Sequence, residues 1–179
     1  MKYLPYIFLI ILIGVASIFV INQPKTVSAY EYDYFRIHIM ANSNSTEDQE
    51  LKYLVKSKLI DFYTPYLAKA ENKEQAINVI EDNLDVASLL INKSLLEAGV
   101  TYEARVEVKK EHFPTRYYEE YCLEEGVYDA IIVTLGVGEG DNWWCVVYPP
   151  LCFVNKKETD AQNIVYQSKF LEIIEKYFR

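Results

Sequence analysis

Hydrophobic and polar positions along this chain follow two periods, and each period predicts a different kind of element. Residues 34–40 alternate apolar and polar side chains, which is the two-residue period of a strand with one buried face. Residues 102–110 repeat this alternation, and residues 127–135 hold an almost unbroken apolar run, as expected of a strand covered on both faces. The pattern therefore predicts three strands, the third of them inside a sheet.

Between the first two strands, apolar residues recur every three to four positions, which is the period of amphipathic helices. Capping sequences that begin at Ser45 or Thr46 open the first helix, which continues to the region of Pro65. Asn72 can cap a second helix, and Gly99 stands where that helix would end. The pair is predicted to form two antiparallel helices with a short joint.

The third strand is followed by a glycine-rich turn at 136–140 and by an aromatic and proline-rich segment at 142–153. Thr159 can cap a last helix with apolar positions at Ile164, Leu171, Ile174 and Phe178. No internal repeat is visible. The order of elements predicts an α+β domain, in which two antiparallel helices and a C-terminal helix pack on a small mixed β-sheet.

The amino-terminal segment predicts export. Lys2 is followed by nineteen residues without a charge, and the small residues Val27-Ser28-Ala29 fit a signal-peptidase site. Residues 1–29 are either a signal peptide cleaved after Ala29 or an uncleaved N-terminal anchor, because nineteen apolar residues can just span about 30 Å of hydrocarbon. Under both interpretations, residues 30–179 form a single domain outside the cytoplasm.

Composition and charge narrow the class of protein. The chain has 179 residues, of which 51% are hydrophobic, so it is not a disordered or low-complexity sequence. Its formal net charge of −8 disfavours nucleic acid as a partner, because phosphate binding needs a surplus of Lys and Arg. The same charge disfavours an anionic membrane surface. Composition and charge alone do not name a function.

The glycine run Gly136-x-Gly138-x-Gly140 follows a predicted strand, as nucleotide-binding loops do. It lacks the spacing of either common nucleotide motif, and Glu139 and Asp141 would repel a phosphate. The run is therefore interpreted as a turn in which glycine allows two backbones to approach closely.

The cysteines allow two interpretations. Cys145 and Cys152 can form a disulfide in an oxidising compartment, because Pro149-Pro150 between them favours a reversal of the chain, and Cys122 is then unpaired. The alternative is three small buried thiols. Cys145 as a nucleophile would need His38 or His112 as its base, and neither lies in a recognisable catalytic sequence. The spacing of His and Cys predicts no metal site, and no cofactor is expected.

Two adjacent tryptophans, Trp143 and Trp144, add a large apolar surface. Neighbouring residues on a strand point to opposite faces, so one of the two is a candidate for an exposed anchor that binds a partner. The alternative is that both are buried against different layers.

Several blocks of sequence carry a resemblance to a known family. The last block is the most specific, because it fixes many aromatic, proline and cysteine positions. The blocks are Arg36-x-His38-Ile39-x-Ala41-Asn42-Ser43-Asn44-Ser45 with Asp48-Gln49-x-x-Lys52, Phe113-Pro114-Thr115, Gly126-x-Tyr128-x-Ala130, and Gly136-x-Gly138-x-Gly140-x-Asn142-Trp143-Trp144-Cys145-Val146-x-x-Pro149-Pro150-Leu151-Cys152. Together they resemble the stage II sporulation protein R family of endospore-forming bacteria.

The resemblance implies an intercellular signal. Family members are made in the forespore and exported into the space between the two membranes. There they trigger a membrane-embedded aspartic protease of the mother cell, stage II sporulation protein GA, which processes the precursor of mother-cell sigma factor E. The resemblance thus implies a non-enzymatic activator whose partner is this protease.

Within this resemblance, two segments are expected to form the partner-binding face, the turn 42–48 and the segment 136–152. The residues expected to bind the partner are Asn42, Ser43, Asp48, Asn142, Trp143, Trp144, Pro149 and Pro150. Two other functions stay open, an exported cysteine-dependent hydrolase and an envelope-binding structural protein. The sequence leaves the oligomeric state undetermined.

Overall fold

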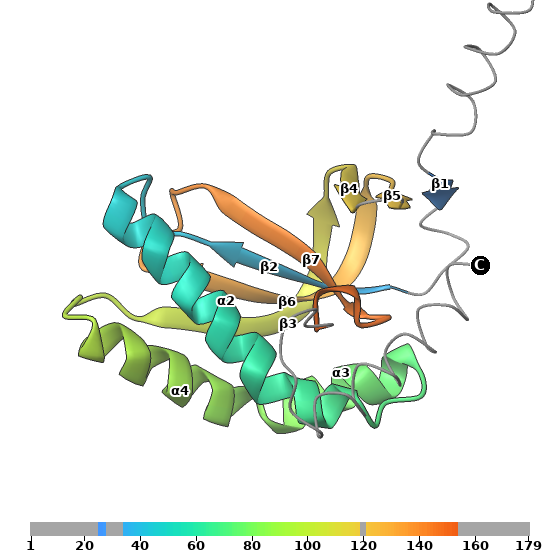
Figure 1. The fold of residues 1–179 in the computed structure, drawn as a ribbon, viewed down its shortest axis with the longest axis horizontal. Coiled ribbons are helices and arrows are strands. Elements are labelled where there is room, and N and C mark those ends of the chain that lie inside the picture. Colours follow the sequence, from blue (N-terminus) through green and yellow to red (C-terminus); the bar gives the residue numbers. More distant parts are fainter. Residues whose placement is uncertain (1–24, 28–33, 119–120, 154–179) are drawn as a thin grey trace, which may run out of the picture. The chain divides into compact units, whose positions relative to one another are not determined.

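The computed structural model describes residues 25–27, 34–118 and 121–153. These residues form two compact units, with residues 113–126 and the amino-terminal segment in the smaller one. The larger unit contains a four-stranded mixed sheet and three helices, so the α+β prediction is confirmed (Figure 1).

The sheet of the larger unit has the strand order β3-β6-β2-β7. The strands span Ala104–Phe113 in β3, Gly126–Leu135 in β6, Phe35–Met40 in β2 and Asn142–Tyr148 in β7. Strand β2 pairs with β6 in parallel and with β7 in antiparallel orientation. Strand β6 lies between β3 and β2, and its apolar residues Ala130, Ile131, Ile132 and Val133 are all buried, so both faces of the strand are covered along this run.

Three helices lie along one face of the sheet (Figure 1): α2 (Thr46–Leu67), α3 (Lys73–Asp82) and α4 (Leu84–Glu97). The single second helix predicted from the sequence is wrong, because α3 and α4 are separated at Asn83, whose backbone leaves the helical region at φ −114° and ψ 11°. The Asn83 side chain donates a hydrogen bond to the Val79 carbonyl at 2.9 Å. Asparagine competes in this way with the helical backbone and favours a break.

Side-chain hydrogen bonds to the backbone tie the helices to the sheet. The Tyr148 hydroxyl at the end of β7 donates to the Glu71 carbonyl, between α2 and α3, at 2.8 Å. The Asn92 amide in α4 bonds both backbone groups of Ala104, at the start of β3, accepting at 2.7 Å and donating at 3.2 Å. These bonds satisfy polar groups at the ends of strands that would otherwise be costly to bury.

The smaller unit contains a three-stranded sheet of order β1-β5-β4. Its strands are β1 (Lys25–Val27), β4 (Arg116–Tyr118) and β5 (Tyr121–Leu123), with β1 parallel and β4 antiparallel to β5. Most of the predicted signal peptide or anchor, and the whole predicted C-terminal helix, lie outside the described residues. None of the helices in the part that is described is long and apolar enough to cross a membrane.

Candidate interaction site

Two loops meet at one end of the four-stranded sheet. One joins β2 to α2, and the other, residues 136–141, joins β6 to β7 and is called the glycine loop below. All six consecutive backbone N–H groups of the glycine loop donate hydrogen bonds within the protein. In order along the loop, their acceptors are the Glu103 carbonyl at 3.0 Å, Asn42 Oδ1 at 3.1 Å, the Leu135 carbonyl at 3.0 Å, the Asn42 carbonyl at 3.2 Å, the Ala41 carbonyl at 2.8 Å and Asn44 Oδ1 at 2.6 Å.

This bonding decides what the glycine loop can bind. Phosphate-binding loops use free backbone N–H groups, and here every such group already has an acceptor. The glycines instead allow the two loops to approach each other closely. A Cβ atom at Gly140 would overlap the Ser43 carbonyl, and one at Gly136, where φ is +56°, would overlap the Asn42 side chain.

Asp48 is the centre of the polar cluster beneath the two loops and is 7% exposed. Its Oδ2 accepts hydrogen bonds from the Ser43 hydroxyl at 2.5 Å and from the Asn42 amide at 2.8 Å. Its Oδ1 accepts one from the Tyr102 hydroxyl, just before β3, at 2.5 Å. One carboxylate therefore joins the turn after β2, the first turn of α2 and the segment that leads into β3.

The hydrogen bonds keep Asp48 ionised although it is buried. Burial raises the pKa of Asp48, but the bonds from Ser43, Tyr102, Asn42 and Ser45 together lower it below its ordinary value. Burial raises the pKa of Tyr102, and so does its hydrogen bond to the carboxylate. The pair therefore exists as a neutral phenol that donates to a carboxylate.

Lys52 connects α2 to the end of the glycine loop. Its side chain is 2% exposed, and its Nζ donates to Gln49 Oε1 at 2.5 Å and to the Asp141 carbonyl at 2.9 Å. Burial lowers the pKa of Lys52, and the nearby Asp141 carboxylate offsets part of this effect. Asp48 and Lys52 both have partners inside the protein, so the cluster holds the loops in place.

The two tryptophans lie on opposite faces of β7, because Trp143 pairs with Ile39 and Trp144 with His38. The Trp143 ring lies 5.1 Å from Lys56 Nζ of α2, on the face that carries the helices. The Trp144 ring stacks on His38 with 5.1 Å between ring centroids, and His38 Nδ1 lies 2.7 Å from Glu111 Oε1 of β3. Both tryptophans are half-buried.

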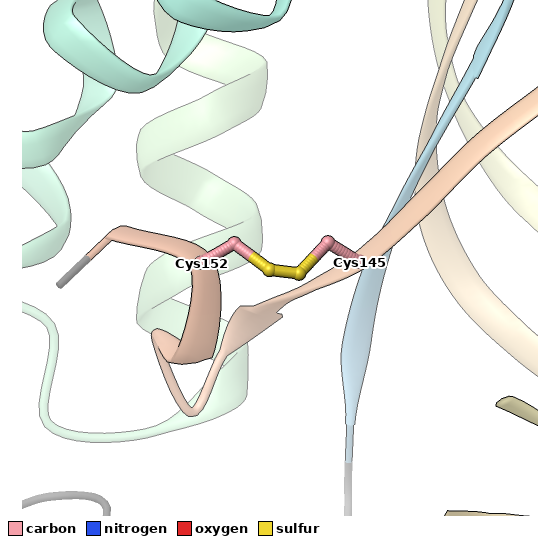
Figure 2. Close-up of a disulfide and its surroundings, with 2 residues drawn as sticks. All are labelled: Cys145 and Cys152. Carbon is pink, nitrogen blue, oxygen red and sulfur yellow. A yellow bond between two sulfur atoms is a disulfide. The ribbon is translucent and has the colours of Figure 1, made fainter. Parts of the chain in front are cut away.

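Cys145 and Cys152 form a disulfide that joins β7 to the short 3-10 helix η1 (Leu151–Phe153) (Figure 2). Their Cα atoms are 6.2 Å apart, within the range for such a bond. Cys145 pairs with Ile37 of β2, so His38 points to the other face of the sheet. The bonded sulfur and this geometry disfavour Cys145 as a nucleophile with His38 as its base.

The residues predicted to bind a partner divide between the two ends of β7. Asn42, Ser43, Asp48 and Asn142 lie at the glycine-loop end, with Trp143 and Trp144 following along the strand. Pro149 and Pro150 lie beyond the other end and are buried. In the described part of the chain, no group of three His, Cys, Asp or Glu side chains could hold a metal ion.

Sequence reasoning missed two residues of this cluster. Tyr102 lies in the strand predicted over residues 102–110 without a functional role, and Lys52 is included only in the family resemblance. Spacing along the chain gives no signal that Tyr102 meets Asp48, because 54 positions separate them. The short spacing from Asp48 to Lys52 on one helix is the signal that could have brought Lys52 into the predicted site.

Comparison with known proteins agrees with the resemblance. The family described as stage II sporulation protein R (spore_II_R) matches residues 31–158. The Stage II sporulation protein R of Bacillus subtilis (strain 168) is 33% identical over 140 residues, which cover 78% of this chain but only 61% of that relative. No solved structure matches. This chain belongs to the stage II sporulation protein R family, and its membership supports a role in sporulation.

Proposed function

We propose that this chain is an exported signalling protein of sporulation that activates a membrane-embedded aspartic protease of the mother cell, stage II sporulation protein GA. The chain is made in the forespore and crosses its membrane into the space between the two membranes. The activated protease then processes the precursor of mother-cell sigma factor E. This is the function expected of the family to which the chain belongs.

The observation that carries this proposal is membership of the stage II sporulation protein R family, and the hydrogen-bonded surface at the glycine-loop end of the sheet supports it. The polar groups of this surface bond one another, as the six N–H groups of the loop and the partners of Asp48 and Lys52 do. Such a surface suits recognition of a protein, because a preorganised loop loses little conformational entropy on binding. The Cys145–Cys152 disulfide is consistent with a compartment outside the cytoplasm.

Two alternative functions make different predictions. A cysteine-dependent hydrolase would require Cys145 as a thiolate, whereas its sulfur is bonded to Cys152. An envelope-binding structural protein would sediment with wall or membrane and would leave processing of the sigma precursor unchanged. The activator function is therefore tested by measuring cleavage of the sigma precursor.

The test uses non-sporulating cells that carry the protease and the sigma precursor from the same organism as this chain. Precursor cleavage is followed by immunoblot with and without the full chain, expressed with its own amino-terminal segment. We expect cleavage only when the chain is present. Absence of cleavage, with the chain shown to be folded and exported, would refute the activator function and leave the two alternatives.

A further inference from the structure

The glycine loop directs its amide groups inward and three of its side chains outward. Val137 at its tip is 71% exposed, and the side chains of Glu139 and Asp141 are exposed as well. Glu103, whose carbonyl accepts the Gly136 N–H, is also exposed. The tip of the loop is therefore an apolar side chain with carboxylates nearby.

Exposure alone does not distinguish Val137, because single apolar residues are common on protein surfaces. Val127, at the other end of β6, is 66% exposed and serves as a direct comparison. The difference lies in the backbone. Val137 lies between Gly136 at φ +56° and Gly138 at φ +70°, and its own N–H donates to the Asn42 side chain. Hydrogen bonds of the loop thus hold the backbone that carries Val137.

The charges around the loop tip determine which kind of partner surface is complementary to it. Lys52 lies beneath the loop, bonds the Asp141 carbonyl and offsets part of the charge of the Asp141 carboxylate. Glu139, two residues after Val137, and Glu103, whose backbone carbonyl bonds Gly136, are both exposed acidic residues. A complementary surface has an apolar pocket for the valine and basic side chains around it, and acidic surfaces are repelled.

We propose that the glycine loop is the element through which this chain recognises the protease, an inference that rests on the proposed function. Val137 inserts into an apolar pocket on the part of the protease that faces the intermembrane space. Glu103 and Glu139 pair with Lys or Arg side chains at the rim of that pocket. The cluster of Asp48, Lys52 and Tyr102 positions the loop from below and does not touch the partner.

Substitution of the tip tests the apolar contact in the cell assay described above, with the rate of precursor cleavage as the readout. Val137→Asp is expected to lower this rate about tenfold or more, as the loss of a central apolar anchor does. Val137→Leu should retain it. Val127→Asp is the matched control and should stay within about twofold of the wild-type rate, since it places the same charge on an equally exposed valine.

Charge reversal tests the proposed ion pairs with basic side chains at the rim of the pocket. Glu139→Lys is expected to slow cleavage by a factor of about three to ten through like-charge repulsion, whereas Glu81→Lys, an exposed control in α3, should not. Thermal unfolding of each purified chain verifies that the loop variants remain folded. The loop is held by its backbone N–H groups, which the substitutions Val137→Asp and Glu139→Lys leave in place. Both variants should therefore unfold near the wild-type temperature.

The outcomes separate the two proposals. If the wild-type chain triggers cleavage and the folded variants Val137→Asp and Glu139→Lys match its rate, the glycine loop is not the recognition element, although the activator function stands. Equal losses in the loop variants and their controls would also overturn the loop as a specific site. Absence of cleavage with the wild-type chain would refute the proposed function itself.

Discussion

At the residue scale, the buried carboxylate of Asp48 is the charged centre of the candidate site and accepts hydrogen bonds from Ser43, Asn42 and Tyr102. Its pKa is lowered in the folded protein because its hydrogen bonds outweigh its burial. A carboxyl group with a lowered folded pKa stabilises the fold above its unfolded pKa, about 3.9, and this stabilisation is lost as the pH falls through the folded pKa. Acid should therefore weaken the link between the two loops.

Asp48→Asn tests this effect. The amide nitrogen would replace one acceptor oxygen among the donors Ser43, Asn42 and Tyr102, so the free energy of unfolding at pH 7 should fall by about 2 kcal/mol. The loss of stability of the wild type below pH ~4 should become smaller in this variant. Urea unfolding at several pH values measures both. Asp61→Asn, exposed in α2, is the control, and an identical pH profile in the two variants would contradict the assignment.

At the element scale, the glycine loop depends on the contact of Gly140 with the turn after β2. Gly140→Ala should lower the free energy of unfolding by about 1–3 kcal/mol, because its Cβ would overlap the Ser43 carbonyl and the backbone would have to shift. Urea unfolding measures this loss. The same variant should slow activation of the protease, since the loop would lose its position.

Gly99→Ala, after α4, provides the comparison. Its φ of +84° costs about 1 kcal/mol for any other residue, but no atom lies within 4 Å of the added Cβ. This variant should therefore be less stable and yet activate at the wild-type rate. If Gly99→Ala and Gly140→Ala slow activation equally, stability alone would explain the loss.

Elements with a local signal could be predicted from the sequence. Alternation located β2, an unbroken apolar run located β6 and helical spacing located α2. The single buried face predicted for β2 was wrong, because Arg36 and His38 on its polar face are buried as well. The break at Asn83 was missed, because both flanking segments carry the same apolar stripe, while the side-chain hydrogen bond from Asn83 to the Val79 carbonyl gives no signal in the spacing of apolar residues. The turn residues Asn42 and Ser43 were predicted as candidates, but their bonds to Asp48 depend on the folded turn.

At the scale of the whole molecule, the Cys145–Cys152 disulfide fixes the end of β7 to η1 (Figure 2). Closing this short loop stabilises the fold by about 2–3 kcal/mol. Cys145→Ser and Cys152→Ser should therefore lose similar amounts of stability in urea unfolding and similar fractions of activity. An activity loss confined to Cys145→Ser, at equal stability, would favour the cysteine-dependent hydrolase. Titration of thiols in the unfolded wild-type chain should detect one, from Cys122.

The contacts that shape the glycine loop come from distant parts of the sequence. Five of its six acceptors lie after β2 or before β3, and Lys52 reaches it from α2. A partly folded chain therefore carries the same residues without the shape that they create together. Recognition that depends on this shape acts as a check on completed folding, because a partly folded chain does not present the surface that the partner recognises.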